Sequence, residues 1–140
     1  MKVAMAQVNP TVGDLEGNTR KVASYIERAR AEKVDLVAFP EMVITGYPPM
    51  DLIPPRDLRM ESGFVERNIE CLRSLVMEAL DITAVVGFVD RDGQELYNAA
   101  AVLHDGRIVG VAHKTLLTTY DVFDELRYFT PSKWIQPINT

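Results

Sequence analysis

The pattern that most restricts the fold is an apolar run, an amphipathic segment and a second apolar run in close succession near the N-terminus. Residues 2–8 are a short, mostly apolar run of strand length, and turn-forming residues follow them. Asn18 stands where an N-cap would begin a helix, and apolar residues at helical spacing continue to about Glu32. Residues 35–39 form the second apolar run. A strand, a helix and a strand with brief connections predict a βαβ unit with two parallel strands.

The rest of the chain adds further elements of both kinds. A second helix fits residues 61–79, and a third buried strand fits residues 82–88. Residues 96–103 and 108–112 have the pattern of two more strands, and the Asp-Gly pair between them is typical of a hairpin turn. Five strands and two helices indicate an α/β protein.

Composition narrows the class of protein. Hydrophobic residues make up 47% and charged residues 25% of 140 residues, which is typical of one globular domain. The net charge of −5 and the lack of a basic cluster make nucleic acid and anionic membranes poor candidate partners. No run approaches the roughly 20 apolar residues of a membrane span. The single cysteine and the absence of a signal-peptide pattern at Met1 favour a cytoplasmic location.

Two of the predicted strands end in a charged side chain. Glu41 follows the strand at residues 35–39, and Lys114 follows the strand at residues 108–112. Glu41 also opens residues 42–58, a Gly- and Pro-rich stretch that predicts an ordered surface loop. Loops at the carboxyl ends of parallel strands often carry functional sites. One such charge is usually a solvated side chain, but a carboxylate and a lysine together suit acid–base and oxyanion chemistry on an amide.

Covalent chemistry of this kind also needs a nucleophile. Cys71 lies in the middle of a predicted helix on an apolar flank, where a thiol is usually inert packing. Ser62 lacks the strand–turn–helix context of a nucleophile elbow. His104 and His113 lie on adjacent predicted strands without a third ligand, so no metal site is expected. The sequence therefore offers a base and a lysine, and no convincing nucleophile.

Three motifs resemble the carbon–nitrogen hydrolase (nitrilase) superfamily. They are Phe39-Pro40-Glu41, His113-Lys114-Thr115-Leu116-Leu117 and Phe123-Asp124-Glu125-Leu126-Arg127-Tyr128-Phe129. Residues 9–14, 45–52 and 120–125 are similar to one branch of it, the glutaminase domains of glutamine-dependent NAD synthetases. The resemblance runs in order from residue 1 to about residue 130.

The resemblance implies a fold and a set of site residues. The fold is a four-layer αββα sandwich, of which residues 1–140 would be a partial domain, truncated before its C-terminal strands and without the synthetase domain. The site is a Glu-Lys-Cys triad with a second glutamate. Glu41 matches the general base, Lys114 the catalytic lysine and Glu125 the second glutamate. Three aromatic residues match substrate-pocket positions: Tyr47, Tyr120 and Phe123.

The resemblance also implies an activity and its partners. The side-chain amide of L-glutamine would be hydrolysed, and the ammonia would pass to the synthetase domain of the full-length chain to amidate nicotinic acid adenine dinucleotide. The family's cysteine comes in a later motif, so these 140 residues are expected to be inactive alone. No cofactor or metal is expected in this domain, and ATP and magnesium are expected only in the synthetase domain. A homo-oligomer is expected.

Three other readings of the sequence stay open. The protein could be a sibling amidase, nitrilase or carbamoylase with the same triad. It could be a non-catalytic fragment or a pseudoenzyme that acts through assembly. It could also be an unrelated α/β binding domain.

Overall fold

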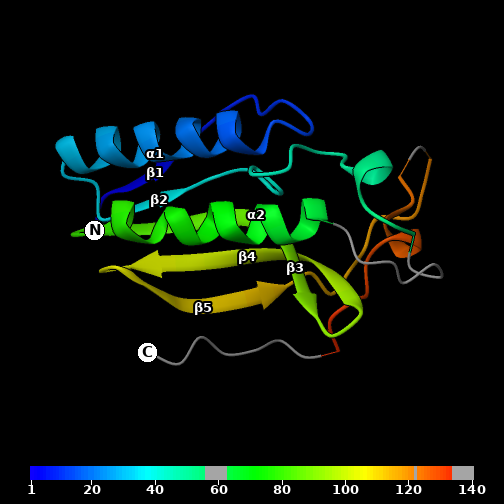
Figure 1. The fold of residues 1–140 in the computed structure, drawn as a ribbon. Helices are drawn as coiled ribbons and strands as arrows, with labels where there is room; N and C mark the ends of the chain where they lie inside the picture. The colour runs from blue at the N-terminus through cyan, green and yellow to red at the C-terminus, as the bar shows by residue number, and fades with distance from the viewer. Residues whose placement is uncertain (56–62, 122, 134–140) are drawn as a thin grey trace.

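The computed structural model of the protein describes residues 1–55, 63–121 and 123–133. One five-stranded sheet runs through it in the order β1-β2-β3-β4-β5 (Figure 1). Strands β1, β2 and β3 are parallel, whereas β3, β4 and β5 are antiparallel. The strands are β1 (Val3–Met5), β2 (Leu36–Ala38), β3 (Thr83–Asp92), β4 (Glu95–His104) and β5 (Arg107–His113).

The helices are α1 (Leu15–Ala31) and α2 (Gly63–Ser74), with short 3-10 turns η1 (Met50–Leu52), η2 (Val76–Ala79) and η3 (Glu125–Arg127). Both helices pack on the same face of the sheet and share one apolar core with it (Figure 1). The α/β class and the predicted βαβ unit are confirmed. The described residues thus supply one helix layer and one sheet of the expected sandwich. No helix in the described part of the chain is both long and apolar enough to cross a membrane.

The predicted start of the first helix is wrong by one turn. Asp14, not Asn18, is the N-cap, and its Oδ1 accepts a hydrogen bond from the Gly17 nitrogen at 2.9 Å. Asn18 is fully buried inside α1 instead. Its amide donates to the backbone oxygens of Thr11 and Ile44, so it ties two loops to the helix. Both residue types suit an N-cap, and tertiary contacts decide between them.

The predicted helix at residues 61–79 ends earlier than expected. Residues 61 and 62 lie outside the described part of the chain, and α2 stops at Ser74, whose hydroxyl donates to the Cys71 carbonyl at 2.7 Å. Residues 76–79 continue as η2. The Arg30 guanidinium, from α1, donates to the backbone oxygens of Glu78 and Leu80 and so fixes this turn.

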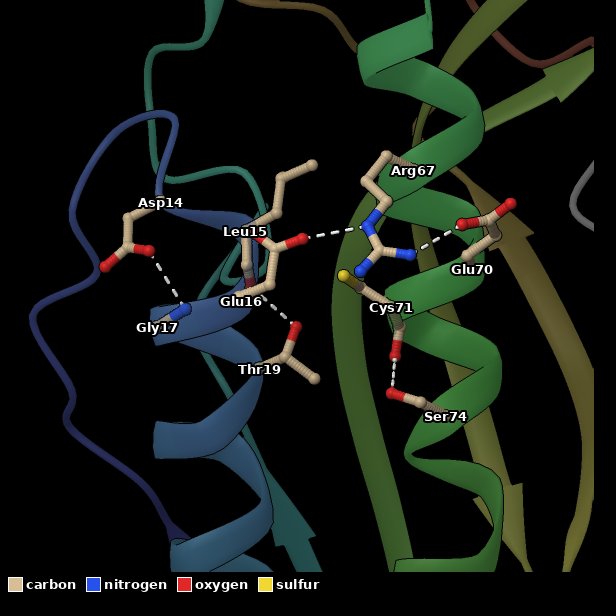
Figure 2. A network of polar contacts seen from close by, with 9 residues as sticks. All are labelled: Asp14, Leu15, Glu16, Gly17, Thr19, Arg67, Glu70, Cys71 and Ser74. Carbon is tan, nitrogen blue, oxygen red and sulfur yellow. Dashed lines mark hydrogen bonds and ion pairs between the residues drawn. The ribbon is translucent and has the colours of Figure 1, made fainter.

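A polar bridge joins the two helices at the surface (Figure 2). Arg67 of α2 donates from Nε to Glu16 of α1 and from Nη1 to Glu70, both at 2.8 Å. The hydrogen bond from Arg67 lowers the pKa of Glu16, and the hydrogen bonds to Glu70 and Glu16 raise the pKa of Arg67. The bridge is exposed, so it orients the helices while the core below holds them.

The predicted surface loop at residues 42–58 is wrong for its first part. The Met42, Val43, Ile44 and Thr45 side chains are at most 1% exposed. They are buried because the chain turns back against β3 and α1 after β2 rather than leaving the sheet. Residues 56–58 lie outside the described residues. All five predicted strands form, but residues 2–8 are not the buried strand that their apolar content predicts: β1 is only Val3–Met5, and Val3 and Met5 are exposed. β2 is also shorter than predicted, and β3 runs further, to Asp92.

Candidate active site

Three predicted site residues meet at one end of the sheet. Glu41 follows β2 and Lys114 follows β5, and these two strands end on the same side of the molecule (Figure 1). The Lys114 Nζ lies 2.9 Å from Glu41 Oε1 and 3.0 Å from Glu125 Oε2. In the sequence, Glu41 lies 73 positions and Glu125 lies 11 positions from Lys114. The fold brings both carboxylates to the Lys114 ammonium group.

The two glutamates have different surroundings. The Glu41 side chain is 48% exposed, whereas Glu125 is fully buried. Besides Lys114, Glu125 accepts hydrogen bonds from the Tyr47 hydroxyl at 3.2 Å and from the Thr118 nitrogen at 2.9 Å. A buried carboxylate needs such donors, because burial of an unpaired charge is costly. Glu125 is therefore fixed in place, and Glu41 is the carboxylate that faces open space.

The charge of Lys114 is maintained by its two neighbours. Partial burial works against the ammonium, but hydrogen bonds and the negative charges of Glu41 and Glu125 outweigh it. The net result is a raised pKa of Lys114, so this residue stays protonated at neutral pH. A permanent cation suits the stabilisation of an oxyanion and does not suit a general base.

The predicted aromatic residues reach the site to different degrees. Burial and the negative charge of Glu125 raise the pKa of Tyr47 to about 12, so its hydroxyl remains a donor to Glu125. The Tyr47 ring lies 6.1 Å from the Phe123 ring, and Phe123 lies 5.8 Å from Tyr120 in an edge-on arrangement. Tyr120 is 71% exposed. The structure thus joins Tyr47 to the charged cluster directly, and places Tyr120 at the outer end of an aromatic row.

Gly87 allows Glu41 to take its position. A Cβ atom on Gly87 would lie 2.5 Å from the Met42 nitrogen and 2.6 Å from the Pro40 oxygen. The backbone around Glu41 therefore passes directly over β3 at a point where no side chain fits. Met42 has a positive φ of 49° and a fully buried side chain, which turns the chain just after Glu41.

An open cavity of about 400 Å³ lies beside these groups. Its walls come from the ends of β2 and β5 and from the middle of β3 and β4, and include Phe39, Glu41, Val85, Gly87, Asn98 and Lys114. The size is in the range of sites for small molecules, and a mainly apolar wall with a few polar groups is typical of them.

The sequence reasoning missed Asn98. Its side-chain amide donates a hydrogen bond to Glu41 Oε1, and its backbone oxygen accepts one from the Lys114 nitrogen at 2.8 Å. The one signal in the sequence is a polar amide inside the otherwise apolar strand 96–103. The fold also pairs His113 Nε2 with Asp90 Oδ2 at 2.7 Å, next to Lys114.

The rejected candidates lie elsewhere. Cys71 is 5% exposed and packs in the core between the helices and the sheet, beside Arg67 and Ser74 in Figure 2. No cysteine is among the described residues that line the cavity. His104 contacts Thr83 and Asp105 instead of His113. Within the described ranges, no three metal-ligating side chains come together.

Comparison with known proteins identifies relatives of this chain. A glutamine-dependent NAD(+) synthetase from Thermotoga maritima is 42% identical over 135 residues, which are 95% of this chain and 22% of that protein. The protein of the same name from Xanthomonas campestris is 41% identical over 130 residues, or 92% and 22% of the two chains. The chain therefore spans about a fifth of the length of these relatives.

Solved structures agree with the fold. The glutamine-dependent NAD+ synthetase from Acinetobacter baumannii, in complex with adenosine diphosphate, matches with a TM-score of 0.83 and 35% identity. That match covers 94% of this chain and 24% of the other. An amidase from Nesterenkonia sp. matches with a TM-score of 0.78 over 100% of this chain and 51% of its own, and at 19% identity it shows the shared fold alone.

The family profile for carbon-nitrogen hydrolases matches residues 2–138, which is nearly all of the chain. This match confirms the resemblance that the three sequence motifs indicated and excludes an unrelated α/β domain. The chain belongs to the carbon–nitrogen hydrolase family.

Proposed function

We propose that residues 1–140 carry the base and the lysine of a site that hydrolyses the side-chain amide of L-glutamine. The observation that carries this proposal is the Lys114 ammonium held between Glu41 and Glu125 beside an open cavity. The relatives from Thermotoga and Xanthomonas, both named glutamine-dependent NAD(+) synthetases, support glutamine as the amide. Ammonia would pass to a synthetase domain of the same full-length protein to amidate nicotinic acid adenine dinucleotide.

In the first half-reaction Glu41 takes the proton of a cysteine thiol, and the thiolate attacks the carboxamide carbon. The carbonyl oxygen becomes an oxyanion, to which the Lys114 ammonium donates a hydrogen bond. One such donor contributes about 3 kcal/mol to transition-state stabilisation in comparable sites. Collapse of the tetrahedral intermediate breaks the carbon–nitrogen bond, and Glu41 returns its proton to the departing ammonia. A thioester of the glutamyl group remains.

In the second half-reaction Glu41 removes a proton from water, and the resulting hydroxide attacks the thioester carbon. Lys114 again stabilises the oxyanion, and glutamate leaves as the thiol is restored. Glu125 and Tyr47 take no proton in this scheme. They hold the ammonium in place and keep it charged.

Cys71 is not the thiol of this mechanism, because it is buried among apolar side chains of the helix layer. The site needs no cofactor or metal, and ATP with magnesium belongs to the synthetase reaction. A reducing compartment such as the cytoplasm suits a reaction that depends on a free thiol.

Ammonia release from L-glutamine by the full-length protein tests the proposal. Glu41→Gln removes the base and should lower kcat by about 10²- to 10⁴-fold. Lys114→Met keeps the length of the side chain without its charge and should lower kcat by about 10²- to 10³-fold. Cys71→Ala is the matched control and should retain activity. Loss of activity in the control with retention in the Glu41 variant would overturn the assignment.

A panel of amides tests the substrate. L-Glutamine, acetamide and a carbamoyl amino acid separate the glutaminase from sibling amidases and carbamoylases of the family. We expect the highest kcat/KM for L-glutamine. If acetamide is preferred and its hydrolysis depends on Glu41 in the same way, the proposed mechanism stands and the assignment of L-glutamine as the substrate is wrong.

A further inference from the structure

Within the described ranges, hydrogen bonds reach one of the two oxygens of the Glu41 carboxylate. Oε1 accepts hydrogen bonds from Lys114 Nζ at 2.9 Å and from the Asn98 amide. Among the described residues, none donates to Oε2. Two donors occupy the lone pairs of Oε1, so an incoming proton meets a free oxygen only at Oε2.

Asn98 connects the base and the lysine through different atoms. Its side-chain amide contacts Glu41, while its backbone oxygen accepts the hydrogen bond from the Lys114 backbone nitrogen at 2.8 Å. The residue lies in β4 opposite Val89 of β3 and is 3% exposed. Because the strand fixes its backbone and burial fixes its side chain, Asn98 sets where Glu41 lies relative to Lys114.

A second buried asparagine shows what a purely structural role looks like in the same protein. Asn68 of α2 is fully buried, and its side chain bonds to the backbone of Val65 and Val89. It ties a helix to the sheet and is not among the residues that line the cavity. Asn98 instead directs its amide to a half-exposed carboxylate at the wall of the cavity.

We propose that Asn98 is a positioning residue for the general base: together with Lys114 it holds Oε1 of Glu41 and leaves Oε2 to take the proton. The inference rests on the proposed function, since it concerns the same thiol. The proton leaves the thiol sulfur and binds Oε2, which gives a thiolate and a neutral carboxylic acid. The hydrogen bonds to Oε1 keep the second oxygen turned toward the cavity during this transfer.

A double-mutant cycle in the full-length protein tests the inference. Asn98→Leu removes the donor, fills a similar volume and leaves the backbone bond to Lys114 intact. We expect kcat for L-glutamine to fall about 10- to 100-fold, because a base displaced by an ångström loses that much, while KM changes little. In the Glu41→Gln background the same substitution should change kcat less than twofold, because the group through which it acts is already lost.

Asn98→Ser repeats the cycle with a smaller polar side chain, and thermal unfolding of each variant reports its folding. Asn68→Ser is the matched control, expected to lower the Tm and to leave kcat unchanged. The inference is overturned if the Asn98 and Glu41 effects multiply in the double variant, or if either Asn98 variant keeps the full kcat. If Glu41→Gln alone retains activity, the proposed function fails, and this outcome is distinct from a failure of Asn98.

Discussion

At the scale of single residues, one ammonium group is shared by two carboxylates of unequal exposure. The buried Glu125 has a full set of donors from Lys114, Tyr47 and Thr118, so it acts as an anchor. The half-exposed Glu41 lines the cavity and, among the described residues, accepts hydrogen bonds at one oxygen only. The two glutamates therefore have different roles, because the fold gives them different hydrogen-bond partners and different access to solvent.

The hydroxyl of Tyr47 predicts a pH dependence of stability. Its pKa is raised from 10 to about 12 in the folded protein, so the unfolded chain loses this proton first. The stabilising contribution is complete below pH 10 and is lost as the pH rises toward about 12. The free energy of unfolding, from urea titrations across this window, should fall less steeply in Tyr47→Phe than in the parent.

Tyr120→Phe is the control, because that ring is 71% exposed and lies at the outer end of the aromatic row. Lys114, whose pKa is also raised, is present in all three proteins, so the difference between their slopes is the quantity to compare. Equal slopes for the parent and Tyr47→Phe would show that the hydroxyl of Tyr47 does not contribute.

At the residue scale, the sequence predicts members of the candidate site where a charged residue directly follows an apolar strand. Glu41 and Lys114 are charged residues directly after apolar runs, and the fold brings them within 2.9 Å. Asn98 escapes notice because its partner is 57 positions away and its own strand is otherwise ordinary. No local sequence pattern links an amide side chain in one strand to a carboxylate that follows a different strand.

At the scale of elements, the close passage of the chain over β3 decides where Glu41 lies. Gly87→Ala should destabilise the protein by about 1–3 kcal/mol, because the added Cβ meets backbone atoms of Met42 and Pro40 that cannot move aside cheaply. The same shift should lower kcat, since Glu41 lies between those two residues. Urea unfolding and ammonia release measure the two effects.

Gly63→Ala is the matched control for this prediction. A Cβ at Gly63, the first residue of α2, meets nothing within 4 Å. Alanine is also the better helix former, so this variant should be as stable as the parent or slightly more stable. A Gly87→Ala protein with unchanged stability and activity would contradict the close approach.

The order and type of the helices and strands could be predicted from local sequence patterns, but the residues at which they begin and end could not. Apolar runs and helical spacing are local, so the βαβ unit and the hairpin were predictable. The start of α1 was not, because Asn18 is held by contacts with Thr11 and Ile44, the second of which lies 26 positions away. The burial of residues 42–45 likewise depends on β3, which begins only at Thr83.

At the scale of the whole molecule, the helices cover one face of the sheet and leave apolar side chains at the β1 edge exposed. Met5 is 80% and Val3 is 51% exposed on this edge strand. An edge strand with exposed apolar side chains favours pairing with another chain. We therefore predict that the chain self-associates. Size-exclusion chromatography with light scattering should show a dimer or a larger species.

Met5→Lys should weaken this association, because a charge on an edge strand opposes pairing. Met77→Lys is the control, since Met77 is 63% exposed in η2 on another element of the molecule. A parent protein that stays monomeric at high concentration, or equal effects of the two substitutions, would contradict the role of the β1 edge.

The ion pair between Lys114 and Glu125 closes a short loop in the chain, and this has a consequence for insertions. The two residues are 11 positions apart, and the aromatic residues Tyr120 and Phe123 lie between them. The entropy cost of closing a loop rises only slowly with its length. Insertions between Lys114 and Glu125 should therefore change the free energy of folding little and leave their ion pair in place.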